Sequence, residues 1–117
     1  MDGIFDYLQD APLFEEICVN GKTYVLVHSG FGEGFCPDRP LDDYTPEELL
    51  FNRPNLLTVY YPNKKVIFGH TPTGYYGERY RGTPVYTGTW IDIDTGVAAG
   101  YSPVLLCLDT MQEFYLQ

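Results

Sequence analysis

Two histidines are the residues of this chain whose types and positions point most directly to chemistry. His28 follows the apolar run "YVLV" and His70 follows "VIFG", so each imidazole comes after a segment typical of a buried strand. If these strands are neighbours in a sheet, both imidazoles lie at one edge, where ligand sites on sheets often form. Imidazole is a common nitrogen ligand of Zn, Mn and Fe. The pattern alone leaves two interpretations open, a pair of metal ligands or two structural residues that form hydrogen bonds.

Arg53 is a third candidate because it directly follows the short helical segment "YTPEELLFN". From the residues alone, the favoured interpretation is a structural one, a cation beside the negative end of the helix dipole.

Four aspartates could supply carboxylate ligands to a metal beside the histidines. Two fall in a loop between His28 and Arg53, and two alternate along an expected strand and therefore face the same side. The second aspartate of that strand precedes a glycine turn, so we interpret it as a cap of backbone amides. We therefore do not expect acids of this chain to rebuild a metal site. The four residues are Asp42, Asp43, Asp92 and Asp94.

The expected elements place the candidate side chains at the ends of strands. Asn20 and Gly21 are typical of a type I′ turn, and a β-rich run lies on each side of them. Thr45 as N-cap and Glu48 three residues later form a capping box, with one proline at the first helical position and another just beyond the helix. We expect strands at 14–19, 22–28, 65–69 and 88–94, two more within 103–117, and a helix at 45–52.

These elements predict an α+β fold, a mixed and mostly antiparallel β-sheet of five or six strands with one or two short helices. We expect one sheet, with the helix at 45–52 packed on one face. Residues 4–8 carry a fragment of an amphipathic pattern that Pro12 interrupts, and we interpret it as the end of an element whose beginning is absent.

Length and composition exclude several classes of protein. The 117 residues suit one domain or part of one, with 44% hydrophobic and 20% charged residues. The formal net charge of −9 argues against a nucleic acid partner. We expect no membrane span, because no run of about 18 apolar residues occurs, and no signal peptide. The three cysteines lack CxxC spacing and indicate free thiols in a reducing cytoplasm.

Four blocks of sequence carry a resemblance to a known family. They read "YVLVHSGF", "LLFNRPN", "VIFGHTPT" and "IDIDTG" followed by "VLLCLD". In order and spacing they are similar to the C-terminal half of the calcineurin-like metallophosphoesterases, and most of all to the bacterial serine/threonine phosphoprotein phosphatases. The resemblance covers residues 8–116, nearly the whole chain.

The resemblance implies that residues 1–117 are the C-terminal portion of such a domain, half of its β-sandwich. It implies that the complete parent uses divalent metals (Mn, Fe or Zn) to hydrolyse a phosphorylated protein or a small phosphate ester. His28 and His70 match the histidines that bind the second metal of a dinuclear site. Arg53 matches the arginine that clamps the substrate phosphate.

The chain departs from the family in ways that affect the expected activity. The family's remaining ligands lie upstream, in motifs of the form GDxHG, GDxxDRG and GNHE, and none of these motifs occurs here. Ser29 stands where alanine or glycine is more usual, which we interpret as a mild change. We therefore expect the isolated chain to be inactive and the chemistry to belong to the complete parent.

Two other hypotheses remain open, a non-catalytic binding or pseudoenzyme module on the same scaffold, and a free-standing hydrolase with a two-histidine site. Unpaired strand edges and apolar faces also predict a homo-oligomer.

Overall fold

The computed structural model describes residues 13–115, so the amphipathic fragment expected at 4–8 lies outside the described residues. The strands are β1 (Phe14–Val19), β2 (Lys22–Val27), β3 (Lys64–Phe68), β4 (Val85–Tyr86), β5 (Trp90–Asp92), β6 (Val104–Cys107) and β7 (Gln112–Tyr115). The helices are α2 (Pro46–Leu50) and the 3-10 turns η1 (Leu41–Asp43), η2 (Thr73–Tyr76), η3 (Glu78–Tyr80) and η4 (Val97–Ala99).

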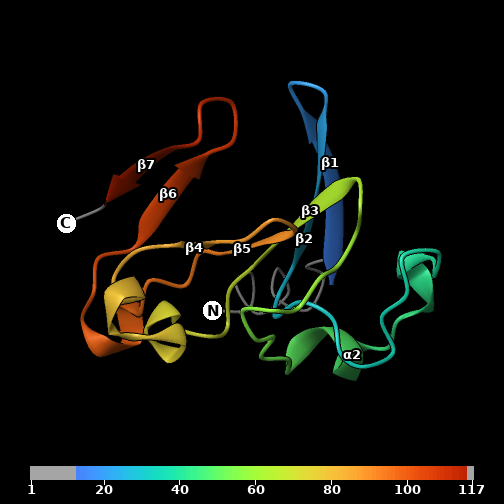
Figure 1. Cartoon of the computed structure of the whole chain (residues 1–117), viewed down its shortest axis with the longest axis horizontal. Helices are drawn as coiled ribbons and strands as arrows, with labels where there is room; N and C mark the ends of the chain where they lie inside the picture. Colours follow the sequence, from blue (N-terminus) through green and yellow to red (C-terminus); the bar gives the residue numbers. More distant parts are fainter. Residues whose placement is uncertain (1–12, 116–117) are drawn as a thin grey trace, which may run out of the picture.

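Five strands form one sheet in the order β1-β2-β3-β5-β4, and β6 pairs only with β7 (Figure 1). The central strands β2, β3 and β5 run parallel, while β1 and β4 are antiparallel to their neighbours. The expected α+β class with a mixed, mostly antiparallel arrangement is confirmed. The expectation of a single sheet is wrong, because β6 and β7 form a separate hairpin.

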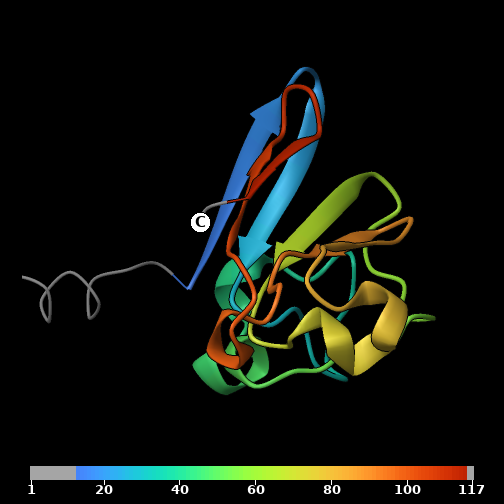
Figure 2. The same cartoon turned by 90° about the vertical axis from the view of Figure 1, so that its left-hand side faces the viewer.

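The central strands are apolar on both faces, as parallel strands usually are, so each face needs a cover. Val66 and Phe68 of β3 belong to one buried cluster, which also includes Leu49 of α2. Ile67 points to the other face, where Tyr24 and Ile91 are buried. The β6–β7 hairpin covers that second face with the side chains Leu106, Leu108 and Met111. Figure 2 shows the hairpin lying along the β1–β2 strands.

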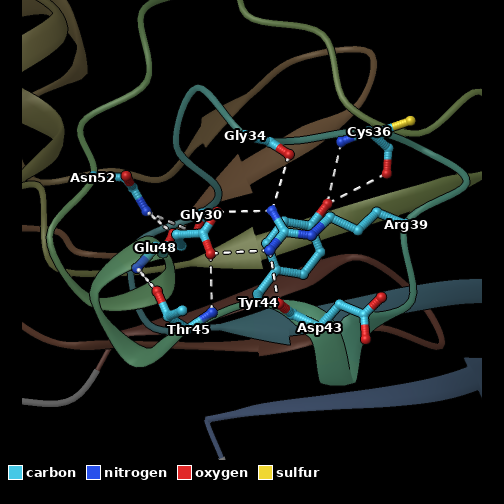
Figure 3. Close-up of polar contacts among 9 residues, drawn as sticks. All are labelled: Gly30, Gly34, Cys36, Arg39, Asp43, Tyr44, Thr45, Glu48 and Asn52. Carbon is cyan, nitrogen blue, oxygen red and sulfur yellow. Dashed lines mark hydrogen bonds and ion pairs between the residues drawn. The ribbon is translucent and has the colours of Figure 1, made fainter.

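The first turn and the start of the helix agree with the predictions made from the sequence. Asn20 and Gly21 have φ values of 53° and 78°, the positive values that a type I′ turn requires. The capping box of α2 is complete, because the Thr45 hydroxyl accepts from the Glu48 amide while the Glu48 carboxylate accepts from the Thr45 amide. Arg39 then binds Glu48 at 2.7 Å, which fastens the preceding loop to the helix (Figure 3).

The helix is shorter than expected, ending at Leu50 rather than at residue 52. The side-chain amide of Asn52 donates to the Glu48 carbonyl at 2.6 Å, which is the carbonyl that the Asn52 backbone amide would use in a longer helix. That backbone amide instead donates to the Ser29 hydroxyl at 2.8 Å. An asparagine side chain thus replaces the last helical bond.

The strand expected at 88–94 is also shorter, and β4 was not predicted. The Thr87 hydroxyl accepts from the amides of Thr89 and Trp90, which forms a tight turn where the sequence suggested a strand. Two residues on the other side of this turn, Val85 and Tyr86, pair with β5. A strand of two residues is too short to show a period in the sequence.

Candidate functional site

Parallel pairing brings the two histidines together. Leu26 of β2 lies beside Ile67 of β3, so both strands end at the same edge of the sheet. Beyond them, the Gly69 amide donates to the His28 carbonyl at 3.0 Å. The imidazole ring centroids of His28 and His70 are 5.1 Å apart with an interplanar angle of 49°. The predicted proximity of the imidazoles is confirmed, whereas their role as metal ligands stays a prediction.

His70 is held in an unusual backbone conformation. Its φ is 71°, in the left-handed region that a residue with a Cβ rarely adopts. The Thr71 amide donates to the Gly69 carbonyl at 2.8 Å, so His70 is the central residue of a three-residue turn. Strained residues of this kind cluster at active sites and ligand clamps. The turn directs the His70 imidazole toward His28 instead of continuing the strand.

The environment of His28 favours its neutral form. Burial lowers the pKa of His28, the charge of His70 lowers it further, and the negative charge of Asp94 opposes both effects. Neutral imidazole is the form that coordinates a metal. His28 is nevertheless solvent-exposed on the described surface, so its ring can be reached from outside.

A buried network that the sequence did not reveal fixes the two histidine loops to α2. Ser29 is 0% exposed, and its hydroxyl donates to the Leu49 carbonyl at 2.8 Å while accepting from the Asn52 amide. The Thr71 hydroxyl donates to the Asn52 carbonyl at 3.5 Å. Asn52 therefore contacts the residue after each histidine. Ser29, which we interpreted as a mild change, has a hydroxyl that joins Leu49 and Asn52 in this network.

The Ser29 hydroxyl does have a signal in the sequence. A serine after a buried strand, where a small apolar residue would pack equally well, implies that its oxygen has buried partners.

Arg53 follows Asn52 in the chain, and its side chain packs against the ring of Tyr75. Its guanidinium carbon is 5.3 Å from the centre of the Tyr75 ring, a cation–π contact. Arg53 and Arg81 together face a pocket of about 310 Å³ that neither histidine lines. Arg53 forms no ion pair within residues 13–115. The guanidinium is therefore free to meet an anion, and its assignment as a phosphate clamp stays a prediction.

Asp92 and Asp94, the two strand aspartates, each accept a hydrogen bond from a nearby backbone amide. The Asp94 carboxylate accepts from the Gly96 amide at 3.1 Å, which confirms the predicted turn cap. Asp92 is 0% exposed, one of its oxygens accepts from the Asp94 amide, and the other has no hydrogen-bond partner in the described structure. Burial raises the pKa of Asp92 to about 8. Asp42 and Asp43 lie in η1, on the loop before α2.

The donor set near the histidines is incomplete for a metal. Within residues 13–115 no group of three or more His, Cys, Asp or Glu side chains could hold a metal ion. Two imidazoles match the ligand type that the resemblance implies, but they lack the carboxylates that a dinuclear site needs. The described residues alone therefore do not fit a complete metal centre.

Comparison with protein-family models gives no match for this chain, and comparison with curated proteins gives none either. In the part of the chain that the structure describes, no helix is both long and apolar enough to cross a membrane. The three cysteines are present as free thiols.

Proposed function

We propose that this chain carries half of a metal-dependent phosphoester hydrolase site of the phosphoprotein phosphatase type. His28 and His70 are the two metal ligands, and Arg53 binds the phosphate of a phosphorylated protein or a small phosphate ester. The observation that carries the proposal is the 5.1 Å separation of two imidazoles at the ends of adjacent parallel strands, one of them on a strained turn. The divalent metal (Mn, Fe or Zn) and a cytoplasmic location are part of the same proposal.

Each group has a task that its own chemistry suits. The imidazoles present nitrogen lone pairs at a solvent-accessible edge. The pKa of His28 is lowered by burial, which favours its neutral form. Arg53 has a planar guanidinium that can pair with two phosphate oxygens. The missing carboxylates would come from outside residues 13–115. We therefore expect the chain by itself to hydrolyse no phosphoester.

Metal binding is tested by titrating the full chain with zinc and recording the imidazole nitrogen resonances. Only two histidines exist, so single variants assign both signals. We expect both imidazoles to shift together over one saturable range, and His28→Ala to abolish the response of His70. His70→Gly should likewise abolish the response of His28. Arg53→Gln is the matched control and should leave the zinc response unchanged.

Independent titration of the two imidazoles would contradict a shared metal site. Turnover of a chromogenic phosphate monoester by the purified chain with manganese, well above the buffer rate, would contradict the expectation that the chain alone is inactive. In-frame coding sequence upstream with carboxylate-rich ligand motifs would support a complete parent enzyme.

The second candidate is a non-catalytic binding or pseudoenzyme module on the same scaffold. The observation that favours it is the lack of a third ligand within residues 13–115. It predicts that phosphate binds at Arg53 without any metal. A phosphate affinity that drops in Arg53→Gln but does not change with added manganese would select this candidate.

A further inference from the structure

All three lysines of this acidic chain line one pocket. The chain has 16 acidic and 7 basic residues, and its lysines are Lys22, Lys64 and Lys65. They surround a cavity of about 460 Å³ whose lining includes no Asp or Glu. In a protein with a net charge of −9, a concave surface lined by lysines and by no carboxylate is a local concentration of positive charge.

The pocket lies at the opposite end of the sheet from the histidines. Strands β2 and β3 are parallel, so their first residues meet at one end and the histidines follow at the other. Figure 1 shows the β1–β2 turn and the β6–β7 turn at the end away from α2. Gly21, Gly88 and Met111, from three different turns, complete the wall. The pocket is therefore separate from the edge that carries the proposed metal ligands.

Register places two of the lysines on one face of the sheet. Lys65 pairs with Tyr24 across the parallel ladder, and Lys22 is two residues before Tyr24 in β2. Because side chains alternate along a strand, Lys22 and Lys65 point to the same side, with Cα atoms roughly 8 Å apart. Flexible side chains from these positions can reach neighbouring phosphate groups.

Two of the three cations are uncommitted. Lys64 forms an ion pair with Glu16 at 2.6 Å and lies 5.2 Å from the centre of the Tyr61 ring. Lys22 and Lys65 form no ion pair within residues 13–115. Thr23 and Asn63 are also among the residues that line the pocket.

We propose that this pocket is a binding site for an oligophosphate anion. Lysine ammonium groups bind phosphate oxygens as point charges, and hydroxyl and amide donors supply directed hydrogen bonds. The cavity volume lies in the range of small-ligand sites, which favours a compact anion over an acidic protein segment. Tyr24 and Tyr61 are 3% and 4% exposed, so neither ring offers a free face for stacking a base. Recognition is therefore of the phosphate chain, whether free or attached to a nucleoside.

The experiment titrates the full chain with sodium tripolyphosphate at a fixed ionic strength of about 0.1 M, by calorimetry and by backbone amide shifts. We expect saturable binding with the largest shifts at Lys22, Thr23, Gly88 and Thr89. K22Q/K65Q should bind about tenfold or more weakly, which corresponds to ~1.4 kcal/mol. K22R/K65R keeps both charges and should retain most of the affinity.

Charge alone is controlled by Arg79→Gln, which removes one cation from exposed η3, outside the pocket, and should not change binding. Far-ultraviolet circular dichroism of each variant confirms that the fold is kept. A parallel titration with ATP separates the two sources of phosphate. Equal affinities show that the phosphate chain alone is read, and tighter ATP binding assigns a nucleoside-borne ligand to the same site.

Three results would overturn the proposal. The first is absence of saturable binding at millimolar tripolyphosphate. The second is an unchanged affinity in K22Q/K65Q, or amide shifts centred on Arg53 and Arg81 instead. The third is tighter binding of an acidic peptide than of tripolyphosphate at the same amides, which would assign the surface to a protein partner.

Discussion

His70 shows how a single backbone angle can indicate a functional position. A residue with a Cβ at φ 71° is strained, and in this conformation the His70 imidazole lies beside that of His28. Glycine adopts this conformation without a steric cost. We therefore expect His70→Gly to be more stable than His70→Ala by about 1 kcal/mol in urea unfolding.

His28 provides the control for this comparison, because its φ is not in the positive region. There the order should reverse, with His28→Ala more stable than His28→Gly, since glycine has more freedom in the unfolded chain. The same order at both positions would show that His70 carries no backbone strain.

Asp92 makes stability depend on pH in a direction opposite to that of a salt-bridged acid. Its folded-state pKa of about 8 lies above the ordinary value of 3.8, because the carboxyl is buried. Between these values the unfolded chain has lost the proton and the folded chain keeps it. Stability should therefore fall as pH rises from 4 to 8, by up to about 1.4 kcal/mol per pH unit.

Asp92→Asn keeps the shape and removes the titration, so its unfolding free energy should vary less over this pH range. Asp109→Asn, at an exposed position, is the matched control and should follow the original chain. Identical pH profiles for all three proteins would contradict the raised pKa.

Among the elements, the connection from β2 to α2 depends on one hydroxyl. Ser29 bonds to both Leu49 and Asn52 in a fully buried position. Ser29→Ala leaves the Asn52 amide without this acceptor, and we expect a loss of about 1–3 kcal/mol. The imidazole signals of His28 should also broaden, because its neighbour is no longer fixed.

Ser102→Ala is a matched control at an exposed position. It should leave both stability and the imidazole signals unchanged. A loss in Ser29→Ala no larger than that in Ser102→Ala would contradict the role of the network.

The start of α2 is protected against acid by Arg39. The hydrogen bond from Arg39, together with that from the Thr45 amide, lowers the pKa of Glu48 to about 2. Because the folded-state pKa is depressed, this contribution is present above the ordinary value of 4.5 and is lost as pH falls through about 2. In Arg39→Gln, carboxyl titration by NMR should give a Glu48 pKa closer to its ordinary value; an unchanged pKa would contradict the pairing.

Local signals predicted the elements well, and long-range contacts escaped prediction. The Asn20–Gly21 turn and the Thr45 capping box are encoded by neighbouring residues, so the sequence sufficed. The role of Asn52 depends on where a loop from another part of the chain arrives, and no periodicity encodes that. The direction of Arg53 escaped prediction because a long side chain has many rotamers.

For the whole molecule, the outer face of the β6–β7 hairpin presents exposed apolar side chains that bear on the expected self-association. Leu105 and Phe114 lie opposite each other in the hairpin and are 61% and 45% exposed. Both strands of the hairpin also have an unpaired edge among the described strands. We predict concentration-dependent association, promoted by salt because the chains repel each other through their net charge of −9.

Leu105→Glu should shift light scattering toward the monomer, because it places a charge in the centre of this face. Val97→Glu adds the same charge at another exposed apolar position, in η4, and should have a smaller effect. A monomer at all concentrations for the unmodified chain would contradict the prediction.

Trp90 provides an intrinsic fluorescent probe of the packing of the sheet. It is the single tryptophan, fully buried in β5, with its ring centre 5.0 Å from that of Phe68 and 5.4 Å from that of Tyr76. Its fluorescence should be emitted at short wavelength while the sheet is intact, and nearby tyrosines should pass excitation energy to it. Separation of β3 or of η2 from this indole would therefore appear as a red shift, without any added dye.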